Sequence, residues 1–81
     1  MDPKEVKEKL RNFIRAELIR NPAYPLEDGD PMISGGLIDS FSLAYIGVFI
    51  ENEFGVYIPD NDLTVANMDT INQMAARILQ R

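Results

Sequence analysis

The chain has 81 residues, a formal net charge of −5, no cysteine and no histidine. A chain of this length forms one domain, residues 1–81, near the lower size at which one core sustains a fold without disulfides or a metal. Without cysteine there is no thiolate metal site or thiol nucleophile, and without histidine a serine–histidine triad is excluded. No stretch approaches the roughly 18 apolar residues of a membrane span, and the first ten residues lack an apolar signal core. We therefore expect a soluble protein of the reducing cytoplasm.

The charges are distributed unevenly along the chain. Residues 1–20 carry six basic and four acidic side chains, whereas residues 27–62 carry eight acidic side chains and no basic one. An acidic segment of this kind repels nucleic-acid phosphates and attracts a basic partner surface. The alternative is that the acidic residues only keep a small domain soluble. We expect no nucleic-acid partner.

The first half of the chain predicts one helix followed by a long loop. Asp2 and Pro3 form a helix start signal, and apolar residues recur at helical spacing up to about Arg20. Residues 21–38 contain three prolines and three glycines and show little periodicity. Loops longer than about 12 to 15 residues are uncommon in compact domains and are usually functional or disordered.

The second half predicts two longer helices with a short one between them. Asp39 or Ser40 can cap a helix that runs to about Phe54, with a glycine at the C-cap. We expect a short helix at residues 62–66 and a last helix that Asp69 or Thr70 opens. The fold class is therefore all-α, a small four-helix bundle of three main helices and one short helix with a long first loop.

The second main helix has two apolar faces. At about 100° per residue, one face carries an ordinary core stripe and the opposite face carries two aromatic side chains and a valine, where charged residues are usual. Such a helix lies at the centre of the bundle, or its outer face binds a partner. The core stripe is Leu43, Ile46, Gly47, Ile50 and Phe54, and the outer face is Phe41, Tyr45, Val48 and Asn52.

Three segments together resemble the acyl carrier protein family. They are Leu37-Ile38-Asp39-Ser40-Phe41, the segment from Glu51 to Gly55, and Ile58-Pro59-Asp60. The hallmark of that family is an Asp-Ser-Leu motif that opens the second helix. The spacing from the serine to these later segments matches without a gap, and the resemblance covers almost the entire chain.

The resemblance implies a carrier and not an enzyme. In that family the serine matching Ser40 bears a covalent 4′-phosphopantetheine arm, which a separate phosphopantetheinyl transferase takes from coenzyme A. The residue matching Asp39 contacts basic groups of that transferase. The cargo is an acyl or aminoacyl group held as a thioester, brought by a loading ligase or acyltransferase and passed to downstream synthases or transferases. Taken alone, either residue could be a simple helix cap. We expect a monomer.

This sequence departs from the usual pattern of fatty acid carriers. Where those carriers place carboxylates two and five residues after the serine, this chain has Ser42 and Tyr45, and Phe41 replaces the usual leucine. Acidic residues persist at Asp39, Glu51 and Glu53. We expect a dedicated carrier of a fatty-acid-like, polyketide or other specialised pathway, whose partners bind Phe41, Tyr45, Val48 and Glu51. An aminoacyl, D-alanyl or peptidyl carrier is the alternative, and a helical protein–protein adaptor without a prosthetic group is the alternative of another class.

Two further patterns concern cargo and metal. Phe13, Phe49 and Phe54 are expected to fill core space that could otherwise hold a long acyl chain, which favours short or polar cargo. Asp28, Asp30 and Asp39 match three positions of a calcium-binding loop, but Met32 and Ile33 stand where a ligand and a glycine belong. We expect no metal site.

Overall fold

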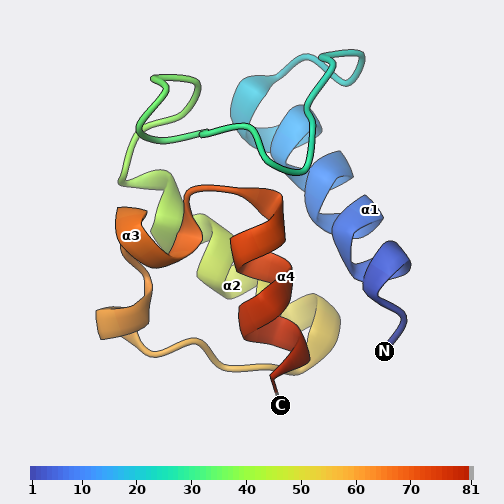
Figure 1. The fold of residues 1–81 in the computed structure, drawn as a ribbon, viewed down its shortest axis with the longest axis vertical. Helices are drawn as coiled ribbons and strands as arrows, with labels where there is room; N and C mark the ends of the chain where they lie inside the picture. The colour runs from blue at the N-terminus through green and yellow to red at the C-terminus, as the bar shows by residue number, and fades with distance from the viewer. Residues whose placement is uncertain (81) are drawn as a thin grey trace.

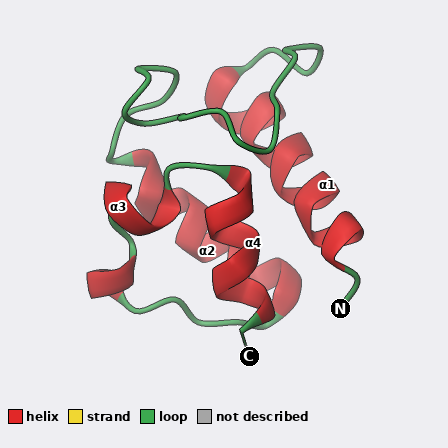
Figure 2. Cartoon of the chain, viewed as in Figure 1, coloured by secondary structure: helices red, strands yellow, loops and turns green. Residues whose placement is uncertain are grey.

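The computed structural model describes residues 1–80 and contains helices but, within that range, no strand (Figures 1 and 2). The prediction of a small all-α bundle is confirmed. No helix of the described chain is long and apolar enough to cross a membrane. The elements are α1 (Pro3–Phe13), a π-helical continuation (Ile14–Ile19), α2 (Ser42–Phe54), a 3-10 turn (Asp60–Asp62), α3 (Val65–Met68) and α4 (Ile71–Leu79).

The first helix begins and ends where the sequence predicts, but its last part has a different helix type. The side chain of Asp2 accepts a hydrogen bond from the Lys4 N–H at 3.0 Å, and proline occupies the first turn. The expected end near Arg20 is confirmed, but the last six residues are π-helical. Arg20 has a φ of 62°, and its N–H donates to the Arg15 carbonyl oxygen. A left-handed residue that closes a helix in this way is a C-cap normally occupied by glycine.

The short helix lies later in the chain than expected. The prediction of a short helix in this segment is confirmed, but its bounds differ from residues 62–66, because a 3-10 turn ends at Asp62 and α3 begins at Val65. Thr64 between them is extended, with φ −126° and ψ 160°, so the two turns cannot join. Met68, the last residue of α3, is fully buried and lies outside the predicted range.

The last helix begins at the second of its two predicted caps. The Thr70 hydroxyl accepts a hydrogen bond from the Gln73 N–H at 3.1 Å, and the Gln73 side-chain oxygen accepts one from the Thr70 N–H at 3.0 Å. This reciprocal capping box satisfies two of the four N–H groups that a helix leaves unpaired at its start. It fixes the junction between α3 and α4.

Side chains from all four helices and from the loops form one core. In Figure 1 the two termini lie at one end of the molecule, and the long loop crosses the opposite end. Helix α4 contacts both α1 and α3. The core contains only apolar side chains: Val6, Leu10, Ile14, Leu26, Met32, Ile38, Leu43, Ile46, Ile50, Val56, Ile58, Met68, Ile71, Met74, Ala75 and Ile78.

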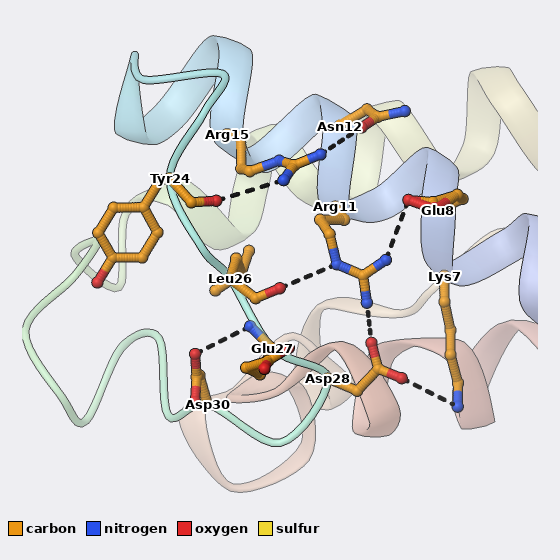
Figure 3. A network of polar contacts seen from close by, with 10 residues as sticks. All are labelled: Lys7, Glu8, Arg11, Asn12, Arg15, Tyr24, Leu26, Glu27, Asp28 and Asp30. Atoms are coloured by element: carbon orange, nitrogen blue, oxygen red, sulfur yellow. Dashed lines mark hydrogen bonds and ion pairs between the residues drawn. The ribbon is translucent and has the colours of Figure 1, made fainter.

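Basic side chains of α1 and of its π-helical continuation hold the first part of the long loop (Figure 3). Arg11 donates from Nε to the Leu26 carbonyl oxygen at 3.0 Å and forms an ion pair with Asp28, which Lys7 also approaches at 3.6 Å. Arg15 donates to the Tyr24 carbonyl oxygen at 3.3 Å. An acidic loop is thus held by the basic helix that precedes it, and Asp28 is paired with two basic side chains of that helix.

Aromatic stacking and an ion pair close the seam between α1 and α2. The rings of Phe13 and Phe49 stack at a centroid distance of 4.2 Å, and Phe54 meets Phe49 edge to face at 6.0 Å. All three are only partly buried and pack against the core from its edge. Nearby, Lys9 contacts Glu53 at 3.1 Å; the hydrogen bond to Glu53, and a further one to Glu5, raise the pKa of Lys9.

Candidate functional site

The candidate site is the junction at which the long loop becomes α2. Asp39 caps this helix: its Oδ1 and its carbonyl oxygen each accept from the Ser42 N–H at 3.1 Å. Ser40 is exposed, and its hydroxyl makes no hydrogen bond with any of residues 1–80. Of the two residues predicted as the cap, the structure assigns the role to Asp39. The Ser40 hydroxyl therefore has no structural function in the described chain.

The other two serines of the sequence are both engaged. The Ser34 hydroxyl donates to Asp69 Oδ2 at 2.5 Å, and the Ser42 hydroxyl donates more weakly to Asp39 Oδ1 at 3.5 Å. Ser40 differs from them in combining exposure with an unoccupied hydroxyl. It is thus the serine that is most open to covalent modification.

The local field at Ser40 suits an anion. Main-chain N–H groups of a helix N-terminus, together with the positive end of the helix dipole, favour negative charge there. The first turn of α2 contains no acidic residue that would already use this field. The carboxylate of Asp39 precedes it and opposes it in part. The N–H groups of Ser42, Leu43 and Ala44 already donate to Asp39, Ser40 and Phe41, so the field at this end of α2 comes from the helix dipole.

Two surface hollows flank the junction. The larger, of about 790 Å³, reaches Ser40 itself and has walls from the loop and from α3. The smaller, of about 500 Å³, lies toward the end of the π-helical segment. Leu18, Asp39 and Ser42 border both hollows. The apolar walls of the larger one come from Leu18, Ile33, Leu37, Ile38 and Val65.

The outer face of α2 is exposed as an apolar surface. Phe41 is 82% exposed, Tyr45 66% and Val48 58%, while Ile46 and Ile50 on the opposite face are fully buried. These exposures exclude the interpretation of α2 as a central helix, which would be covered on both sides. Tyr57, 59% exposed, is a further large apolar side chain in the loop after α2.

The acidic residues near this face differ in whether they form ion pairs. Glu53 forms an ion pair with Lys9. Glu51 has no ion pair with any described residue. Together with Asp60, Val48 and Tyr57 it borders a hollow of about 230 Å³. Unpaired negative charge near the exposed face is therefore carried by Asp39, Glu51 and Asp60.

Sequence reasoning missed Tyr57 and the role of Asp69. Tyr57 stands between Val56 and Ile58, which are both buried, and this alternation places it away from the core. The alternation in the sequence could therefore have predicted the exposure of Tyr57. Asp69 could be recognised only as a candidate cap, because its contacts with Ile33 and Ser34 span 35 or more residues.

The carboxylates do not form a metal site among residues 1–80. No group of three or more acidic side chains there lies close enough to hold an ion. Of the three positions that match a calcium loop, Asp28 binds Arg11, Asp30 accepts from the Glu27 N–H at 2.9 Å, and Asp39 caps α2. Each carboxylate thus has a separate local role.

Comparison with known proteins gives a fold but no family. No family model matches the chain, and no curated protein does. Eleven chains of known structure are similar. One belongs to a crystal structure described as that of an FAD-dependent dehydrogenase; it matches with a TM-score of 0.73 and 28% identity over 85% of this chain and 97% of that chain. The two coverages show that the matched chain is itself small and shares nearly its whole fold with this one.

The exposure of the α2 outer face leads to a stability prediction. Phe41→Ala, Tyr45→Ala and Val48→Ala should each change the free energy of unfolding by no more than about 0.5 kcal/mol, because little apolar surface is buried there. The control Ile46→Ala should cost about 2 to 5 kcal/mol, because it leaves a cavity in the core. Urea unfolding followed by circular dichroism measures both. A loss of about 3 kcal/mol at Phe41 or Tyr45 would place this face in the core.

Proposed function

We propose that the chain is a carrier protein that holds an acyl or aminoacyl intermediate on a 4′-phosphopantetheine arm attached to Ser40. The observation that carries this proposal is the exposed hydroxyl of Ser40, which takes no part in the cap that Asp39 supplies. An exposed hydroxyl without a partner in the described chain is accessible to a modifying enzyme. The resemblance to acyl carrier proteins supplies the identity of the arm.

The residues around Ser40 fit such an arm. Its phosphodiester would lie at the N-terminus of α2, and the hollow of about 790 Å³ beside Ser40 offers apolar walls and an open mouth to the chain beyond it. When attached, the arm supplies a terminal thiol that carries the cargo as a thioester. The protein positions the attachment point and presents a docking face, and the chemistry of the cargo belongs to partner enzymes.

The partners we propose are a phosphopantetheinyl transferase, a loading ligase or acyltransferase, and the enzymes that use the cargo. A flavin-dependent dehydrogenase is a candidate among the last group, because the similar chain belongs to a structure described as an FAD-dependent dehydrogenase. Residues 1–80 form no strand, so they lack the parallel sheet of a Rossmann-type dinucleotide site. Flavin chemistry is therefore proposed for a partner and not for this chain.

A helical adaptor without a prosthetic group is the second candidate. The exposed apolar side chains Phe41, Tyr45 and Val48 favour it equally, since any protein partner could cover them. It leaves the free Ser40 hydroxyl unexplained. The two candidates differ in one measurable respect, which is whether the chain accepts an arm.

Incubation with coenzyme A and a permissive phosphopantetheinyl transferase tests the carrier directly. The intact mass of the protein should increase by that of one arm, and fragmentation should place the arm on Ser40. Ser40→Ala should remain folded and unmodified, whereas Ser34→Ala and Ser42→Ala should still accept one arm. No mass increase would favour the adaptor, and an arm on Ser34 or Ser42 would contradict the site.

The α2 face is expected to serve in transfer. Phe41→Ala and Tyr45→Ala in the loaded carrier should each weaken transfer to the cognate enzyme by about 1 to 2 kcal/mol, because aromatic anchors often dominate binding. The effect should depend only weakly on salt. Steady-state transfer kinetics at two ionic strengths measure it, with Lys4→Ala as a remote control. A larger, salt-sensitive loss in Glu51→Gln would show instead that ion pairs dominate docking.

The packing of the core suggests short or polar cargo. Ile46, Ile50 and Ile71 are fully buried, so a long acyl chain would have to displace them. When hexanoyl and longer chains are loaded onto the arm, amide chemical-shift changes should stay close to Ser40 and the two flanking hollows. Broad shifts at the three isoleucines would show a chain inside the protein and contradict this expectation.

A further inference from the structure

The segment that leads to Ser40 is held by one distant carboxylate. Asp69 Oδ1 accepts from the N–H groups of Ile33 at 2.7 Å and Ser34 at 3.0 Å, and Oδ2 accepts from the Ser34 hydroxyl at 2.5 Å. The Asp69 carbonyl oxygen accepts a fourth bond, from the Met32 N–H at 2.8 Å. Three successive loop residues are thus bound to a single residue of the α3–α4 junction.

Asp69 is itself fixed by that junction. Its N–H donates to the Gln73 side-chain oxygen at 2.8 Å, the oxygen that also accepts from Thr70. The amide nitrogen of Gln73 donates in turn to the Ala66 carbonyl oxygen in α3, at 3.0 Å. The capping box of α4 therefore connects α3, Asp69 and the loop. At the α3–α4 junction the anchor is therefore held in place by the hydrogen bonds of Gln73.

The five residues between the anchor and Ser40 have little freedom. The Met32 carbonyl oxygen accepts from the N–H groups of Leu37 at 2.9 Å and Ile38 at 3.0 Å, which closes a tight turn. Gly36 has a φ of 81°, and a Cβ at Gly35 would collide with the Pro31 carbonyl oxygen, so the turn requires both glycines. Ile38 is buried, and the next residue is the cap of α2.

The same turn forms a wall of the larger hollow beside Ser40. Ile33, Ser34 and Leu37 stand on the loop side, and Val65 stands on the α3 side. Partial burial acts to raise the pKa of Asp69, but the hydrogen bonds from Ser34 and Ile33 outweigh it, and the pKa is lowered. The carboxylate is therefore charged near neutral pH and available as an acceptor for all three donors.

We propose that Asp69 is a positioning residue for the modification of Ser40. By holding the turn of residues 32–38 against the α3–α4 junction, it fixes the direction in which the free Ser40 hydroxyl faces the transferase. Asp69 does not line the hollow beside Ser40. This inference rests on the proposed carrier function and names a second residue on which that function depends.

The test compares the kinetics of arm transfer in anchor variants. Asp69→Ala removes all three side-chain bonds, Ser34→Ala removes one, and Asp69→Asn keeps an oxygen for the two N–H donors. Misplacement of a reacting group by about 1 Å can cost a hundredfold in rate. We expect kcat to fall by about ten- to a hundredfold in Asp69→Ala, with KM within about twofold because the α2 face is intact, and Asn to restore most of kcat.

Asp28→Asn is the matched control, because it loosens the other end of the same loop, at Lys7 and Arg11, without touching the turn. Its kcat should stay near that of the wild type. Amide hydrogen exchange in the unmodified variants should be faster at Ile33 and Ser34 in Ser34→Ala, and unchanged there in Asp28→Asn. Ser34 is exposed, so this variant folds even where Asp69→Ala does not, and its kcat should then fall in step with the faster exchange.

Two negative results have different meanings. If the wild-type chain accepts no arm, the proposed function fails whatever Asp69 does. If the wild type is modified and Asp69→Ala or Ser34→Ala shows faster exchange at the turn with unchanged kcat, the positioning role alone is overturned. The same holds if Asp28→Asn lowers kcat as much as the anchor variants do, because the effect would then be general loosening of the loop.

Discussion

The hydrogen bonds between Asp69 and residues 32–34 are the constraint on which the geometry of this molecule depends. They join the first long loop to the start of the last helix, two parts of the chain that no covalent link brings together. At its other end the loop is held by Arg11 and Asp28. After the second anchor the backbone continues through the turn that the Met32 carbonyl oxygen closes, to the cap Asp39 and the exposed Ser40.

Polar anchors of this kind suit a chain of 81 residues that has no cysteine. A small domain buries a smaller fraction of its surface than a large one, so its loops cannot rely on apolar contacts alone. The core is entirely apolar, and the charged contacts all lie at its edges. The outer face of α2 is not needed for packing, because the burial of Leu43, Ile46 and Ile50 already anchors that helix in the core.

The sequence predicted the elements well where local signals were strong. Periodicity, the caps at Asp2 and Thr70, and Gly55 at the end of α2 placed three helices, and angular position on α2 separated Phe41, Tyr45 and Val48 from the core. The short helix was misplaced because its position depends on the burial of Met68, which is a tertiary effect. The tie between Asp69 and Ser34 has no local signature. The sequence could name Ser40 and its cap, but not the residue that holds their loop.

The π-helical segment at Ile14–Ile19 sets the register of the side chains at the end of the first helix. A π turn accommodates one residue more than the α-helix around it, and such insertions often occur beside functional sites. A chain lacking one residue in this segment would continue as a regular α-helix, and its later side chains would rotate by about 100°. Leu18, which borders both hollows, would turn away from both. The length of this helix therefore helps to determine the shape of the surface around Ser40. A related chain one residue shorter here would present its serine on a surface of different shape.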